Sequence, residues 1–121
     1  MILLLVALAG GAGAGTRFWL DTVVARRNHT GIPLGTILIN VSGSLLLGLI
    51  TGWALAHDGA SSLRAVAGTG FLGGYTTFST ASVEGVRLIR SGRPWVALAH
   101  TGGMLVLGLV CAGLGLWLTA G

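Results

Sequence analysis

The sequence predicts an all-α polytopic membrane protein with four transmembrane helices. Only 8% of its 121 residues are charged and 53% are hydrophobic, and the mean hydropathy is +0.87. Soluble domains carry about 25% charged residues, so this chain lacks the polar side chains to cover a surface that faces water. Stretches without Lys, Arg, Asp or Glu provide the apolar length of membrane helices, at 1–16, 28–57, 65–83 and 94–121.

These stretches position the four helices. A spanning helix needs about 20 mostly apolar residues, so the first and third stretches qualify only if Arg17 and Glu84 are included. We expect a single domain with helices at about 2–20, 33–56, 63–89 and 95–118. The expected loops are Asp21–Gly31, His57–Ser62 and Arg90–Pro94. The first stretch could instead be a signal peptide, but it lacks the basic residues that precede the apolar core of such peptides.

Arginine is unevenly distributed between the two sides of this predicted bundle. Loops one and three carry or adjoin Arg26, Arg27, Arg87, Arg90 and Arg93, whereas only Arg64 lies near loop two. By the positive-inside rule, loops one and three are cytoplasmic and both termini are outside the cell. The scattered arginines do not form a nucleic-acid-binding face. A lone cysteine, Cys111, excludes a disulfide framework or a cysteine metal site within one chain.

Small residues recur at helical spacing on the second and fourth predicted helices. Ser44, Gly48 and Gly52 are spaced by four residues, and so are Gly108 and Ala112. Such faces let helix backbones approach closely in lipid, either within one chain or between subunits. Their density across several helices favours an oligomer.

The third predicted helix differs from the others because glycines and hydroxyl residues interrupt it. Gly70, Gly73 and Gly74 weaken the helix in its middle, and a hydroxyl run follows: Thr76, Thr77, Ser79, Thr80 and Ser82. Non-helical backbone at membrane depth is tolerated only where protein or a water-filled cavity satisfies its polar groups. We therefore expect a break whose carbonyls, from Gly73 to Thr76, suit a small cation. The hydroxyls can bind an ion, or can bond back to carbonyls of their own helix.

Four further side chains are unusual in a membrane helix: Asn40, Phe78, Arg17 and Glu84. The amide of Asn40 offers two N–H donors, which can hold an anion without charge or can link helices. The ring edge of Phe78 is partly positive and attracts small anions, although most membrane phenylalanines serve packing. Arg17 can bond carbonyls at a helix end, and Glu84 can pair with Arg87.

Together these residues resemble the Fluc (CrcB) family of fluoride channels. The resemblance rests on Gly-Ala-Gly-Thr-Arg17, on Asn40-Val-Ser-Gly-Ser44, and on the segment from Gly70 to Thr80 with Glu84. It implies a fluoride-selective channel in the cell membrane that exports fluoride passively. It also implies an antiparallel dimer, in which a structural sodium ion at the centre is not transported.

The resemblance assigns roles to individual residues. The fluoride pathway would be formed by Asn40, Phe78, Thr77, Ser79, Thr80 and Ser82. Backbone oxygens of Gly73 and Thr76 would hold the sodium ion, and Arg17 and Glu84 match recurrent charged positions of the family.

One departure from the family concerns assembly. The second pore phenylalanine of the family falls at Ala81 here. Family channels occur as homodimers with balanced charge or as heterodimers of oppositely biased homologues, so Ala81 and the arginine bias favour an oppositely oriented homologue as partner. A homodimer, a non-conducting subunit and a small drug–proton antiporter are the alternatives. The antiporter needs a carboxylate, usually in the first helix, and none precedes Asp21. No nucleophile, metal cluster or phosphate loop indicates an enzyme.

Overall fold

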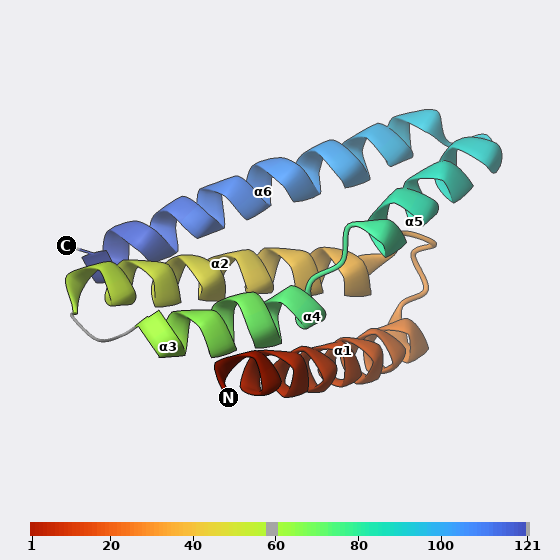
Figure 1. Cartoon of the computed structure of the whole chain (residues 1–121). Helices are drawn as coiled ribbons and strands as arrows, with labels where there is room; N and C mark the ends of the chain where they lie inside the picture. Colours follow the sequence, from red (N-terminus) through yellow and green to blue (C-terminus); the bar gives the residue numbers. More distant parts are fainter. Residues whose placement is uncertain (58–60, 121) are drawn as a thin grey trace.

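The structure, a computed structural model, describes residues 1–57 and 61–120, which are helical apart from short connections. The helices are α1 (Ile2–Arg27), α2 (Leu34–Ala56), α3 (Ser61–Leu63), the π-helix η1 (Arg64–Leu72), α4 (Gly73–Tyr75), α5 (Ser79–Arg90) and α6 (Pro94–Ala120). By length and composition, α1, α2 and α6 are each able to cross a membrane. The segment from α3 to α5 forms the fourth rod in two parts, because the helix is interrupted between α4 and α5 (Figure 1).

The first helix is longer than predicted. Its expected end near residue 20 is wrong, because α1 continues to Arg27. Asp21 stays helical and lies against Gly35 of α2, and basic residues in the last turn complement the negative end of the helix dipole. The first connection is therefore only 28–33, and the central part of the predicted loop His57–Ser62, residues 58–60, lies outside the described residues.

A glycine-dependent turn joins α5 to α6. Gly92 has φ +81°, a left-handed conformation that side chains disfavour. The N–H of Arg93 donates to the carbonyl of Leu88 (2.9 Å), and the N–H of Gly92 donates to that of Ile89 (3.1 Å). These two bonds satisfy the end of α5 in a Schellman motif. Pro94 then begins α6, where its missing N–H removes no helix bond.

The helices pack in a fixed order. In Figure 1, α2 lies between α6 and the η1–α4 segment, and α1 lies beyond that segment. After the interruption, α5 turns away and packs along the beginning of α6 (Figure 1). Because α5 leaves the line of α4, the interruption lies beside α2 and α6 rather than within a straight rod.

Glycines fix the contact between α2 and α6. A Cβ at Gly48 would collide with the carbonyl oxygen of Ala112, and one at Gly115 would lie 2.6 Å from the carbonyl of Leu45. The two backbones therefore touch, as in close membrane-helix pairs. Gly48 and Gly52 therefore serve packing within the chain, whereas Ser44, Gly108 and Ala112 are half-buried and line the groove described below.

Glycines also hold the third rod against α1. A Cβ at Gly74 would collide with the carbonyl of Gly10, and one at Gly70 would lie 2.9 Å from the carbonyl of Val6. Both Gly70 and Gly74 are helical, which corrects the prediction that the glycines themselves break the helix. Their role is close packing, and they make α1 part of the bundle, which disfavours the signal-peptide alternative.

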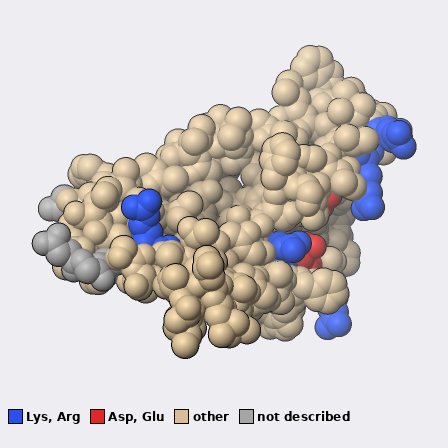
Figure 2. All heavy atoms as spheres, viewed as in Figure 1, with Lys and Arg blue, Asp and Glu red and all other residues tan. Residues whose placement is uncertain are grey.

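The outside of the bundle is largely apolar, with charge at one end. Exposed large side chains include Phe18, Trp95 and Trp117, as expected for a surface in contact with lipid or a partner. Figure 2 shows most basic side chains gathered at the end where α1 and α5 finish. The bundle therefore has a basic end, and the described opposite end carries little charge.

Candidate functional site

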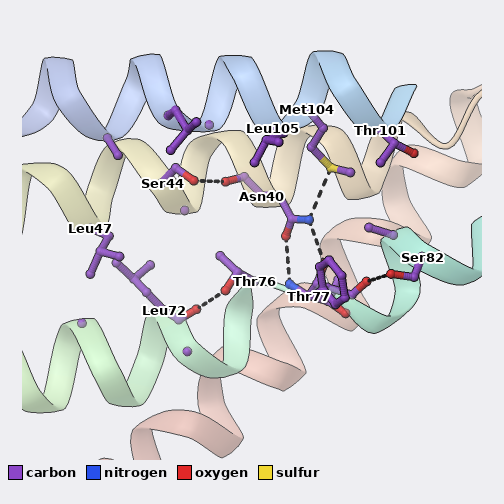
Figure 3. A pocket seen from close by; sticks show the side chains of 18 of the residues that line it. Asn40, Ser44, Leu47, Leu72, Thr76, Thr77, Ser82, Thr101, Met104 and Leu105 are labelled. Atoms are coloured by element: carbon purple, nitrogen blue, oxygen red, sulfur yellow. Dashed lines mark hydrogen bonds between the residues drawn. The ribbon is translucent and has the colours of Figure 1, made fainter. Parts of the chain in front are cut away.

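The interruption of the third rod is held by one side chain of α2. Thr76 is extended, with φ −79° and ψ 158°, so the helix ends there. The N–H of Thr77 donates to Oδ1 of Asn40 (2.8 Å), and Nδ2 of Asn40 donates to the carbonyl of Thr77 (2.8 Å). Both backbone groups of Thr77 are thus satisfied by one amide, as the paired dashed lines in Figure 3 show. Asn40 replaces the helix bonds that the break removes.

The same arrangement changes the bonding of two carbonyls. In a continuous helix, the carbonyl of Gly73 would accept from the N–H of Thr77, which here donates to Asn40. The carbonyl of Thr76 would accept from the N–H of Thr80, which here donates to Oγ1 of Thr77 (3.2 Å). The carbonyls of Gly73 and Thr76 therefore lose their helix donors, whereas two of their neighbours accept from other donors.

Those neighbours have donors within the chain. The carbonyl of Leu72 accepts from the N–H of Thr76 (2.9 Å), and that of Gly74 accepts from Nε of Arg17 (3.3 Å). Arg17 thus bonds a carbonyl at a helix end, as predicted. Its guanidinium also places positive charge near the interruption.

The two released oxygens fit a hard cation. Sodium and similar ions prefer neutral or anionic oxygen ligands, and backbone carbonyls at a helix break are common ligands for them. The α-carbon of Gly73 faces open space, because a Cβ built there would meet nothing within 4 Å. Two carbonyls alone do not fill the coordination shell of such an ion, so it would need further ligands.

Several predicted pathway hydroxyls form local bonds. Thr76 Oγ1 donates to the carbonyl of Leu72 (2.9 Å), and Ser82 Oγ donates to the carbonyl of Phe78 (2.9 Å). Thr77 Oγ1 caps the first turn of α5, as described above. Bonding back to a carbonyl of the chain, the alternative left open by the sequence, therefore applies to Thr76 and Ser82, whereas Thr77 Oγ1 accepts from an N–H.

A groove of about 670 Å³ runs along the interruption, between the third rod and α6. Figure 3 shows its lining, which includes four of the predicted pathway residues and the departure from the family: Asn40, Thr77, Phe78, Ser82 and Ala81. Ser79 and Thr80 do not line it. The side chain of Phe78 is 86% exposed, so its ring has little packing within the chain.

Met104 is a site residue that the sequence did not reveal. It is buried on α6, and its Sδ lies 3.3 Å from Nδ2 of Asn40 (Figure 3). A thioether is a weak acceptor, so this N–H is held less firmly than the one that donates to Thr77. The contact depends on the register of α2 against α6, which no local sequence pattern specifies.

Glu84 lies at the border of a second cavity of about 530 Å³, near the basic end. Its Oε1 accepts a hydrogen bond from Oγ1 of Thr36, on α2. Arg87 and Arg93 line the same cavity. The predicted local partner, Arg87, thus shares a cavity with Glu84, whereas the hydrogen bond comes from a threonine that sequence analysis did not single out.

Comparison with known proteins finds one family. Residues 4–116 match the family model described as CrcB-like protein, Camphor Resistance (CrcB). The chain is 52% identical to the fluoride-specific ion channel FluC 1 of Leifsonia xyli subsp. xyli, across 98% of this chain and 86% of that protein. It is 52% identical to FluC 2 of Cutibacterium acnes, across 96% and 95% of the two chains. It is 43% identical to FluC of Hyphomonas neptunium, across 95% and 92%.

Removal of the Asn40 amide should destabilise the break. Asn40→Ala leaves both backbone groups of Thr77 without partners, and each buried unsatisfied group costs about 1–3 kcal/mol. We expect a clear fall in the thermal unfolding midpoint of the detergent-solubilised protein. The control is Met104→Leu, which removes only the weak sulfur contact and should cost less than about 1.5 kcal/mol. Equal stability of the two variants would contradict a structural role for the amide.

Proposed function

The chain belongs to the CrcB family, and from this premise we propose that it forms a fluoride-selective channel that lets fluoride leave the cytoplasm passively. Its long apolar helices and its relatives make it a multi-pass membrane protein of an ion-channel family, not an enzyme. The observation that best supports the proposal is the groove at the helix break. Neutral donors and an aromatic ring converge there around Asn40.

Fluoride would pass along this groove by exchanging water for neutral donors. The N–H of Asn40 that contacts the Met104 sulfur can turn to an anion at little cost, because the sulfur is a weak acceptor. The hydroxyls of Thr77 and Ser82 and the ring edge of Phe78 would provide the next contacts. Since none of these groups is charged, the ion is not trapped.

The site is incomplete in one chain, and we propose a dimer as the conducting unit. The groove is open, and the exposed ring of Phe78 lacks a packing partner within it. The break lies near the middle of the third rod, so a two-fold axis in the membrane plane would bring two breaks together in an antiparallel pair. Such a pair would also enclose Ser79 and Thr80, which lie outside the groove of one chain.

A sodium ion fits the centre of that pair. The carbonyls of Gly73 and Thr76 from two chains would supply its oxygen ligands, and the ion would offset the repulsion between carbonyl dipoles. It would be structural and would not be transported. It would hold the two helix breaks, and thereby the two Asn40 side chains, at a fixed separation.

The partner we propose is an oppositely oriented homologue. Ala81 lines the groove where a second aromatic ring would complete a pair with Phe78. The basic end of the bundle favours one orientation in the membrane, so two copies of this chain would insert alike and would not form an antiparallel pair. A homodimer and a non-conducting subunit are the alternatives that the following measurement separates.

Fluoride efflux from liposomes tests the channel directly. We expect the chain reconstituted with a homologue of opposite charge bias to release fluoride rapidly and to retain chloride. Fast efflux from this chain alone would establish a homodimer instead. The absence of fluoride efflux from both preparations would contradict the proposed function. Phe78→Ala should lower efflux, whereas Phe18→Ala, which removes another exposed ring, on α1, should not.

Sodium replacement tests the proposed ion. When N-methylglucamine replaces sodium on both sides of the membrane, the carbonyls at the dimer centre lose their cation, so we expect loss of efflux and a larger monomer fraction on size exclusion. Restoring sodium should reverse both effects. Unchanged efflux and assembly after thorough sodium removal would rule out a structural sodium ion.

The basic end of the bundle predicts the orientation of the chain in the membrane. A reporter fused to the C-terminus should be found outside the cell in almost every molecule, because the arginine-rich connections stay in the cytoplasm. A matched variant with Arg26 and Arg27 replaced by Gln should show a mixed orientation. Equal numbers of C-termini on the two sides for the unaltered chain would contradict the fixed orientation.

A further inference from the structure

Two polar side chains are almost fully buried in the described part of the chain, and one of them lacks partners. Thr36 is 1% exposed and donates to Glu84. His100, on α6, is 4% exposed, and neither Nδ1 nor Nε2 has a hydrogen-bond partner. A neutral imidazole has one N–H donor and one acceptor nitrogen, so both are left unsatisfied whichever tautomer is present. Buried polar groups in that state are rare and indicate a missing ligand or water.

His100 lies between the groove and the second cavity. On α6, the groove begins at Thr101, and the second cavity includes Arg93, which precedes the helix. On α5, Ser82 lines the groove and Glu84 lines the second cavity. We call the stretch between the two cavities the partition. His100 and Thr36 line neither cavity and belong to it, and Glu84 borders it at the second cavity.

The register of α2 against α6 brings Thr36 and His100 to the same level. Asn40 contacts Met104, and Gly48 contacts Ala112, so a residue of α2 faces the residue 64 positions later. One turn before Asn40, this register pairs Thr36 with His100. Among the described residues, Thr36 and His100 have the two most buried polar side chains. This burial agrees with their facing each other across the packed pair of α2 and α6.

We propose that His100 is a fluoride-binding station inside this partition, between the groove and the arginine-lined cavity. The inference rests on the proposed channel function. The unpaired N–H of the imidazole would donate to fluoride as the ion leaves Asn40. His100 lies one helical turn before Met104 on α6, and Met104 contacts Asn40. The arginines of the second cavity, Arg87 and Arg93, would then attract the ion toward the basic end.

The charges around His100 predict a pH dependence. On the neighbouring elements, Glu84 and Arg87 of α5 line the second cavity, and Asp21 of α1 lies against Gly35. Neither α2 nor α6 has another His, Asp, Glu, Lys or Arg. Protonation of the imidazole adds a second N–H donor and a positive charge to this station. Fluoride should therefore bind more tightly as the pH falls through the range in which histidine titrates.

Nuclear magnetic resonance can detect the contact without requiring conduction. The full chain with ¹⁵N-labelled histidine, in its conducting assembly in nanodiscs, gives ring signals from His29, His57 and His100. Sodium fluoride should shift only the signal of His100, and sodium chloride should shift none. The apparent affinity for fluoride should rise by roughly fivefold or more as the pH is lowered from about 7 to about 5, a typical coupling between two binding events. An unshifted His100 signal in a conducting preparation would overturn the proposal.

Flux measurements give a second readout. His100→Phe removes the ring N–H, and should lower fluoride efflux about tenfold, as expected for loss of a hydrogen bond to a charged ligand. His100→Gln keeps an N–H donor that cannot titrate, so it should conduct faster than the Phe variant and lose the pH dependence, after the leak of empty liposomes is subtracted. His57→Gln is the matched control, because His57 is exposed at the far end of α2.

The outcomes separate this inference from the channel function. A wild-type assembly that releases no fluoride would contradict the proposed channel function. A conducting wild type whose pH profile is unchanged in His100→Gln would reject His100 as a station and leave the channel intact. If the His100 variants do not fold, the fluoride titration of the wild-type signal still decides the matter.

Discussion

The structure depends above all on the pairing of the Asn40 amide with the backbone of Thr77. A helix cannot stop inside a membrane unless something replaces its hydrogen bonds, because an unsatisfied N–H or C=O in hydrocarbon costs several kcal/mol. At Thr77, the backbone N–H and the backbone C=O both need a new partner. A carboxylate lacks the donor and a hydroxyl has a single oxygen, whereas a primary amide presents both groups on a planar fork. The break at this position therefore requires an amide on the facing helix.

That amide is positioned by glycine contacts elsewhere on α2. One turn beyond Asn40, a Cβ at Gly43 would collide with the methyl group of Thr76, so glycine lets the break approach α2. Two turns beyond Asn40, Gly48 seats α2 on α6 and fixes the register that brings Met104 to Asn40. In a membrane, where burial of apolar surface drives helix association only weakly, such backbone contacts determine where a side chain can reach.

The sequence predicted the rods and the existence of a break, because hydropathy and the glycine–hydroxyl run are local signals. It placed the break at the glycines, whereas Gly70 and Gly74 serve packing against α1 and remain helical, and the interruption follows Tyr75. It also did not reveal the bonding of Asn40 to the backbone, or the neighbours Met104 and Thr36. These depend on the register between helices distant in sequence, which single-chain periodicity does not encode. His100 could have been flagged as an ionisable residue within an apolar helix, which is a functional hypothesis by default.

The break that creates the site also leaves it unfinished in one chain, and this is the strongest physical support for the proposed dimer. By turning the N–H groups of Thr77 and Thr80 to side chains, the fold deprives the carbonyls of Gly73 and Thr76 of their helix partners. Such oxygens are unstable against lipid, so they need either water, a cation or another protein surface. The open face at Gly73 and the exposed ring of Phe78 lie on the same interrupted segment. A single protein surface that covers both would provide partners for the oxygens and would also enclose the groove. The same contact would therefore stabilise the helix break and complete the ion pathway.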